Sequence, residues 1–139
     1  MKIYLKQNGY WNWLEGEALQ AELKAQNISI GEGARIGEWA RIGEWASIGE
    51  GASIGKEARI GKGASIATTL DYIVMGPLGS DDRMLTFYQR DGIRAATGCF
   101  DGTLDEFRSA VEQKHGATRH GREYRAATDY AASKFAIVK

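Results

Sequence analysis

Isoleucine recurs at every sixth position through the middle of the chain. An alanine stands two positions before each isoleucine after the first, and an arginine or serine separates the two. The series consists of Ile30, Ile36, Ile42, Ile48, Ile54, Ile60 and Ile66. A period of six matches neither the about 3.6 residues of a helical turn nor a heptad. It is typical of short strands joined by corners, three of which close one triangular coil.

The period also predicts which residues lie side by side on successive coils. Residues 18 positions apart are then in register, separated by about 4.8 Å, the spacing of neighbouring strands. Arg35 lies over Ser53, whereas Arg41 lies over Arg59. Stacked like charges are unfavourable on adjacent strands. The isoleucines and alanines fill the inside of the coil, and we expect glycine to let the backbone turn at the corners.

Two tryptophans occupy outward corners of the predicted coils. Trp39 stacks over Glu57, and Trp45 stacks over Gly63. Exposed tryptophans of this kind are unusual on the surface of a monomer. We interpret Trp39 and Trp45 as interface residues of a homotrimer; the alternative is a platform for a ligand.

These features resemble a known family. Residues 27–66, with the repeated unit Ala-(Arg/Ser)-Ile-Gly, resemble the hexapeptide repeats of left-handed parallel β-helix proteins, which are best known from acyltransferases. The resemblance implies a left-handed coil and a parallel homotrimer around its axis. The repeats supply little more than two coils, whose open ends leave backbone groups unpaired. Caps and self-association must therefore stabilise so small a core.

The first 26 residues are predicted to form an N-terminal cap. Alternation over Met1–Trp13, with the turn signal Asn8-Gly9, predicts a short hairpin or strand. Residues Glu15–Gln26 are rich in Ala, Leu, Glu and Lys and predict a helix of about three turns. A degenerate first coil is the alternative for this segment.

The six-residue period stops after Ile66, so we assign the β-helix to residues 27–69 and a small α+β unit to residues 70–139. A strand is predicted over Asp71–Met75, ended by Gly76-Pro77. The dipeptide Asp91-Gly92 predicts a two-residue hairpin between strands over Met84–Arg90 and Ile93–Cys99.

Two helices complete the predicted unit. Thr103 and Glu106 form a capping box that opens a helix ending near Gly116, with its apolar face on Leu104, Phe107 and Val111. A second helix is predicted from Arg119 to Phe135, burying Tyr124, Ala127, Ala131 and Phe135. The predicted fold class is thus mainly β: a short left-handed parallel β-helix with a C-terminal hairpin and two helices, assembled as a homotrimer.

Composition narrows the function classes. The chain of 139 residues has 18 Lys and Arg against 18 Asp and Glu, which argues against a general nucleic-acid binder. It has neither an apolar run long enough to span a membrane nor the pattern of a secretory signal. The single cysteine, Cys99, excludes an intramolecular disulfide framework and a cysteine-rich zinc site. We expect a cytoplasmic protein of a reducing compartment, without a cofactor.

Catalytic motifs are weak. The resemblance to acyltransferases implies a histidine general base in the coils, but the two histidines, His115 and His120, lie in the tail. Cys99 with His115 is a conceivable nucleophile–base pair, although a lone cysteine is more often a small buried residue. The spacing of the histidines is not that of a helical zinc pair, so no metal site is expected.

Local charge gives the strongest functional signal. Residues 108–125 carry five Lys and Arg against two Glu, a local charge of +3 in a neutral chain. Arginine, histidine and tyrosine together suit phosphate groups. The predicted ligand-binding residues are Arg119, Arg122, Arg125, His115, His120, Tyr124, Ser80 and Arg83. The alternative is a solvated helix face with ordinary ion pairs.

The tail carries a second resemblance. Gly98-Cys99-Phe100, Gly102-Thr103-Leu104, Glu106-Phe107, His115-Gly116, His120 and Glu123-Tyr124 are similar to a tail on hexapeptide-repeat proteins of bacteriophages. The expected function is that of a non-catalytic trimeric phage-type accessory protein that binds a small anionic ligand, such as a nucleotide signal of host defence, in the cytoplasm of an infected bacterium. The alternatives are a divergent hexapeptide-repeat acyltransferase and a structural trimerisation or protein-interaction module.

Overall fold

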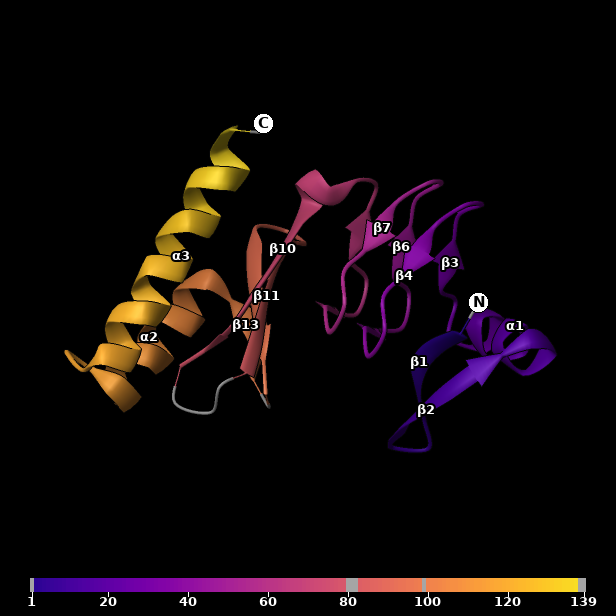
Figure 1. The fold of residues 1–139 in the computed structure, drawn as a ribbon, viewed down its shortest axis with the longest axis horizontal. Coiled ribbons are helices and arrows are strands. Elements are labelled where there is room, and N and C mark those ends of the chain that lie inside the picture. The colour runs from indigo at the N-terminus through magenta and orange to yellow at the C-terminus, as the bar shows by residue number, and fades with distance from the viewer. Residues whose placement is uncertain (1, 80–82, 99, 138–139) are drawn as a thin grey trace.

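The chain folds into an elongated series of layers (Figure 1). The computed structural model describes residues 2–79, 83–98 and 100–137. From the N-terminal end the layers are a hairpin with one helix, the coils of the repeats, an antiparallel sheet and a pair of helices. Ser80 and Cys99, to which the sequence pattern gave roles, lie outside the described residues.

The repeats form two-residue strands, one for each isoleucine. They are β3 (Ser29–Ile30), β4 (Arg35–Ile36), β5 (Arg41–Ile42), β6 (Ser47–Ile48), β7 (Ser53–Ile54), β8 (Arg59–Ile60) and β9 (Ser65–Ile66). Parallel pairing joins β3–β6–β9, β4–β7 and β5–β8, one ladder for each face of the coil. The predicted register is confirmed, because Arg35 pairs with Ser53 and Arg41 with Arg59.

Glycine has two different roles in the coils. The glycine that follows an isoleucine permits close packing at several positions: a Cβ on Gly31 would lie 2.3 Å from the Glu50 nitrogen, and one on Gly37 would lie 2.6 Å from the Lys56 nitrogen. The left-handed corner residues come two positions later and are Gly33, Trp39, Trp45, Gly51, Glu57 and Gly63. The prediction that glycine turns the backbone therefore holds only at some corners, since tryptophan and glutamate occupy the others.

The N-terminal segment extends one face of the coil. Strands β1 (Lys2–Gln7) and β2 (Tyr10–Glu15) form a hairpin, and β1 pairs in parallel with β5. The resulting sheet has the order β2-β1-β5-β8. Helix α1 (Gly16–Ala25) buries Leu19 and Leu23 in the same core as the isoleucines. The segment is a helix, as predicted, and the alternative of a degenerate coil was wrong.

A short 3-10 turn (Thr69–Asp71) leads from the coils into a four-stranded antiparallel sheet. Its strands are β10 (Tyr72–Leu78), β11 (Arg83–Gln89), β12 (Ile93–Thr97) and β13 (Phe100–Thr103). A hairpin at Asp91-Gly92 is confirmed, but its loop has three residues and not the two predicted, because Gln89 pairs with Ile93. Strand β13 was not predicted. The prediction that β10 ends at Gly76-Pro77 was wrong. A register shift accommodates the proline, which an edge strand tolerates because its N–H is not needed there.

The two predicted tail helices are confirmed. Helix α2 (Leu104–His115) begins with the Thr103–Glu106 capping box and ends at Gly116, which has a φ of 52°. Helix α3 (Arg119–Ile137) buries the four predicted side chains against the sheet. The sheet is therefore covered on both sides, with Tyr88 facing the coils and Phe87 facing the helices.

Side chains of the tail sheet satisfy the open end of the coils. The Tyr72 hydroxyl donates to the Ser53 carbonyl (2.6 Å) and accepts from the Gly55 N–H (2.9 Å). The Arg59 N–H donates to the hydroxyl of buried Thr86 (2.9 Å). The cap that the short repeat array requires is thus supplied by this sheet.

Candidate ligand-binding site

Two of the predicted ligand-binding arginines are bonded to the turn between α2 and α3. Nη1 of Arg125 donates to the Gly116 carbonyl (2.8 Å) and to Glu112 Oε2 (3.2 Å). Nη1 of Arg122 donates to the Ala117 carbonyl (2.8 Å). These carbonyls lie at or just beyond the end of α2, where backbone acceptors lack helical partners. Both arginines therefore stabilise the turn.

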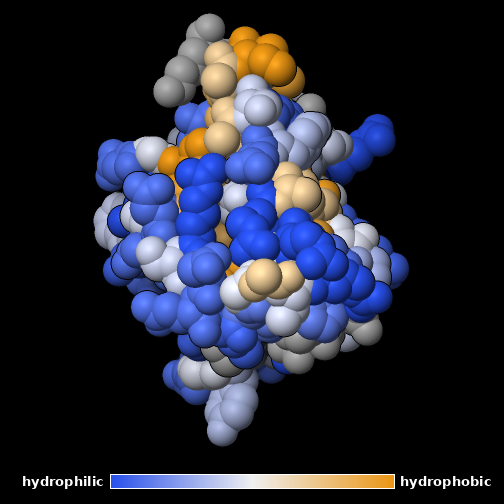
Figure 2. All heavy atoms as spheres, turned by 90° about the vertical axis from the view of Figure 1, so that its left-hand side faces the viewer, coloured by the Kyte–Doolittle hydropathy of each residue, from blue (hydrophilic) through white to orange (hydrophobic). Residues whose placement is uncertain are grey.

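The third arginine lies on a solvated face. Arg119 Nε is 3.8 Å from Glu123 Oε2, an ordinary i,i+4 pair, and Arg108 pairs with Asp129 at 3.6 Å. The outer side of α2 and α3 is mainly hydrophilic (Figure 2). The structure does not gather Arg119, Arg122 and Arg125 into the two hollows described below.

Three other predicted residues do come together, around a cavity of about 340 Å³ between the tail sheet and the helices. We call it the tail cavity. Its lining consists of Arg83, Thr97, Gly98, Phe100, Phe107, Ala110, Val111, Lys114, His115 and Tyr124. Arg83, His115 and Tyr124 were predicted from the sequence; Phe100, Phe107 and Lys114 were not.

A row of aromatic rings forms one wall of the tail cavity. The ring centroids of Phe100 and Phe107 are 5.3 Å apart, and those of Phe107 and Tyr124 are 5.5 Å apart and almost perpendicular (88°). The row continues from Tyr124 to His115 (5.5 Å) and from His115 to His120 (5.8 Å). These distances are those of favourable aromatic pairs. The wall is therefore fixed by packing before any ligand arrives.

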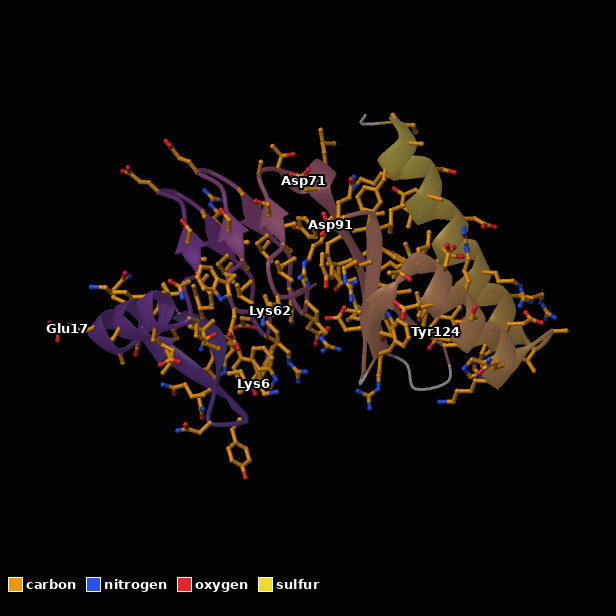
Figure 3. All side chains as sticks on the ribbon, turned by 180° about the vertical axis from the view of Figure 1, so that it is seen from behind. Lys6, Glu17, Lys62, Asp71, Asp91 and Tyr124 are labelled. Atoms are coloured by element: carbon orange, nitrogen blue, oxygen red, sulfur yellow. The ribbon has the colours of Figure 1, made fainter. Side chains whose placement is uncertain are left out.

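Tyr124 also anchors the end of β10 beside the tail cavity. It points from α3 toward the tail sheet (Figure 3). A Cβ on Gly79 would lie 1.8 Å from the Tyr124 hydroxyl oxygen, so a larger residue does not fit there. The Gly79 N–H donates to Glu123 Oε1 (3.0 Å). Glu123 thus ties the strand to α3, a structural role.

The ionisable side chains other than Tyr124 in the lining of the tail cavity are basic. Arg83, Lys114 and His115 contribute cationic or protonatable side chains, and the described lining residues include no carboxylate. His120 packs edge-on against His115, and its Nδ1 is buried without a hydrogen-bond partner among the described residues. An apolar cavity with a few basic groups suits an anion that carries a ring.

A second hollow, of about 500 Å³, lies on the outer face of the β2-β1-β5-β8 sheet. We call it the arginine pocket. Its lining consists of Tyr4, Trp39, Arg41, Glu57, Arg59, Pro77, Arg83, Met84 and Gly98. Arg83 and Gly98 line both hollows. The sequence signal for this pocket was the stacked Arg41–Arg59 pair, to which sequence reasoning gave no function.

The two corner tryptophans differ in their surroundings. Trp39 is 48% exposed, and its ring packs edge-on against Tyr4 (5.4 Å) and Trp13 (5.4 Å). Trp45 is 59% exposed. Trp39 therefore belongs to an aromatic cluster within its own chain, and Trp45 is the more exposed of the two rings.

Other polar clusters have structural explanations. Tyr88 donates to Asp101 Oδ1 (3.1 Å), and Arg94 lies 3.5 Å from the same oxygen. Burial, followed by the charge of Asp101, raises the pKa of Tyr88. In the part of the chain that the structure describes, no three His, Cys, Asp or Glu residues form a metal-binding group. None of the described helices is long and apolar enough to cross a membrane.

Comparison with known proteins finds a similarity in the middle of the chain. No curated protein and no solved structure matches the chain. Residues 27–62 match the family model described as bacterial transferase hexapeptide (six repeats). This range spans β3 to β8, the strands whose coil register is described above. The central coils of this protein are therefore similar to the hexapeptide repeats of that family.

Proposed function

We propose that this protein is a non-catalytic binding protein that holds a small organic anion in the tail cavity. The observation that carries the proposal is the combination of a continuous aromatic wall with Arg83, Lys114 and His115 around one cavity. Small-molecule sites commonly combine an apolar lining with a few placed polar groups. The ligand's ring packs against Phe100, Phe107 and Tyr124, and its anionic group lies at the basic side chains.

A nucleotide carries both chemical features and is the first ligand class to test. Its base supplies the ring, and its phosphate accepts charge-assisted hydrogen bonds from Arg83 and Lys114. The resemblance of the tail sequence to tails of bacteriophage hexapeptide-repeat proteins supports a proposed biological role. In that role the protein sequesters a nucleotide signal of host defence in the cytoplasm of an infected bacterium.

The same proposal includes the assembly. The chain coils with a left hand and forms a homotrimer in which the corner tryptophan Trp45 contacts a neighbouring subunit. Its support is the hexapeptide match, the exposure of the Trp45 ring and the short array of coils. A cavity of about 340 Å³ on each subunit then gives three equivalent sites.

Acyl transfer is the second candidate, because the matched family model is one of bacterial transferases. A general base has to reach the acceptor group that it deprotonates. His115 and His120 lie on the tail helices, and His115 lines the tail cavity, not the coils. Turnover of acetyl-CoA that is abolished by His115→Gln would favour this function. A purely structural trimerisation module is the third candidate.

Calorimetric titration with a panel of mononucleotides tests the proposed function. Lys114→Gln removes one charge-assisted hydrogen bond, which contributes about 1.5–3 kcal/mol, and is expected to weaken binding roughly ten- to a hundredfold. Ala110→Phe fills the cavity and is expected to abolish binding. Ala126→Phe, at an exposed position of α3, is the matched control. Binding that survives Ala110→Phe but is lost in Arg122→Ala would place the site at the α2–α3 turn instead.

A further inference from the structure

The arginine pocket is built on outward positions of adjacent strands. Tyr4 of β1 pairs with Arg41 of β5, and Arg41 pairs with Arg59 of β8. Their neighbours Ile42 and Ile60 are buried inside the coil. Because side chains alternate along a strand, the two arginines stand on the outer face, directly one above the other.

This stacked pair is a charge arrangement that the repeat does not require. Like charges on adjacent strands repel each other. The equivalent position of other repeats holds Ser47, Ser53 and Ser65, and these stand on the same kind of strand. Serine is therefore compatible with the strands of the coil, so the coil itself does not require an arginine at this position.

The structure holds the three guanidinium groups in place. The Arg41 guanidinium carbon lies 5.1 Å from the centre of the Trp11 ring, a cation–π contact. Arg59 Nη1 donates to the Gly98 carbonyl. Arg83 enters from β11 and packs over Gly98, where a Cβ would lie 3.4 Å from the arginine Cδ. Arginines from three separate segments thus converge on one hollow.

Two aromatic rings line the same pocket as these arginines. Trp39 and Tyr4 line the pocket, with ring centroids 5.4 Å apart at an angle of 73°. Trp39 has a φ of 64°, a corner conformation that Gly33, Gly51 and Gly63 share, as do Trp45 and Glu57. Glycine therefore fits this corner without a change of the backbone.

The charge of the pocket selects a multiply charged anion. Its described lining has three arginines against one carboxylate, Glu57. The adjoining hollow, which also touches Arg41 and Arg59, adds Lys6 and Lys62 but balances them with Glu44 and Asp101. Lys6 and Lys62 lie on the same side of the molecule (Figure 3). The positive excess is therefore centred on the three arginines.

We infer that the arginine pocket is a second binding site, which takes a nucleoside di- or triphosphate. The oligophosphate lies against Arg41, Arg59 and Arg83, which match phosphate oxygens in bidentate geometry. The base lies against Trp39 and Tyr4. This site does not depend on the tail cavity, although Arg83 borders both.

The test is calorimetric titration with inorganic tripolyphosphate and with ATP at constant ionic strength. Arg41→Ser introduces the residue that other repeats carry and is expected to weaken both ligands about tenfold or more. Arg35→Ser is the matched control, because Arg35 is exposed, occupies the same repeat position opposite Ser53 and lies outside the pocket. It is expected to bind as the wild type does.

The contribution of the nucleotide base to binding is tested separately. ATP is expected to bind more tightly than tripolyphosphate, and Trp39→Gly is expected to remove that difference while keeping the corner conformation. Equal losses in Arg35→Ser and Arg41→Ser would show only general charge attraction and would overturn the inference, as would a wild type that binds neither ligand.

The variant Ala110→Phe separates the two sites. Ala110 lines the tail cavity and is not among the lining residues of the arginine pocket, although Arg83 and Gly98 border both. ATP binding that persists in this variant and weakens in Arg41→Ser supports the arginine pocket, whatever happens to the proposed tail ligand. ATP binding that is lost in Ala110→Phe and unchanged in Arg41→Ser assigns the nucleotide to the tail cavity and overturns the second site.

Discussion

Equivalent glycines of the repeat differ in how closely other side chains pack against them, although they occupy the same position of the sequence pattern. Gly55 and Gly61 both follow a buried isoleucine. A Cβ on Gly55 would lie 3.8 Å from the Tyr72 hydroxyl, an ordinary contact, whereas one on Gly61 would lie 1.9 Å from the Tyr88 hydroxyl. Gly61 is thus the place where the tail sheet docks closely on the coils.

We therefore expect Gly61→Ala to lower the free energy of unfolding by about 1–3 kcal/mol, because fully buried Tyr88 has to shift. Gly55→Ala is the matched control and is expected to change the free energy of unfolding by less than about 1 kcal/mol. Urea denaturation of the two variants and the wild type measures both values. Equal effects would mean that the tail sheet does not pack on the coils as described.

At the scale of elements, helix α2 depends on local bonds at its two ends. The Glu106 carboxylate accepts from the Thr103 N–H (2.8 Å), and the Thr103 hydroxyl accepts from the Glu106 N–H (3.1 Å). The backbone bond from Thr103, followed by its side-chain bond, lowers the pKa of Glu106. At the other end, Arg122 and Arg125 bond the carbonyls of the turn into α3.

The lowered pKa of Glu106 gives a pH dependence with a definite sign. The ionised carboxylate stabilises the folded state at neutral pH, above the ordinary pKa of glutamate. That contribution is lost as the pH falls through the lowered, folded-state pKa. Glu106→Gln is expected to reduce stability at pH 7 and to flatten its decline in acid. Unfolding curves between neutral and acid pH test this, and parallel curves for the variant and the wild type would contradict it.

At the scale of the whole molecule, two cores meet at the tail sheet. One runs from Ile3 and Leu5 through the coil isoleucines to Tyr72 and Tyr88. The other lies between the sheet and helices α2 and α3. The sheet caps the coils at one end while the β1–β2 hairpin and α1 close the other end (Figure 1). Trp45 stays largely exposed on the coils that are capped in this way.

We expect Trp45→Gly to weaken the proposed trimer without disturbing the coil. Glycine occupies the equivalent corner at Gly33, Gly51 and Gly63, so the backbone keeps its conformation and loses strain of about 1–2 kcal/mol. Light scattering across a concentration series is expected to show dissociation at higher concentration than for the wild type. An unchanged assembly mass in that series would remove Trp45 from the interface.

The local and periodic features of the fold follow from the amino-acid sequence alone. The isoleucine period specified the coil register, because a one-residue slip would expose every isoleucine. The signals at Asn8-Gly9, Asp91-Gly92 and Thr103–Glu106 specified two turns and a helix start, since each acts over a few residues. The tail helices followed from their buried stripes.

Which distant surfaces meet depends on the packing of the whole chain. Local charge made Arg122 and Arg125 look like ligand-binding residues, but the α2–α3 turn brought backbone carbonyls within their reach. The arginine pocket joins Tyr4, Arg41 and Arg83, which are far apart in the chain. No pattern within a few residues or at a fixed period relates such segments. Their proximity depends on which apolar faces are buried together when the hairpin and the tail sheet close the two ends of the coils.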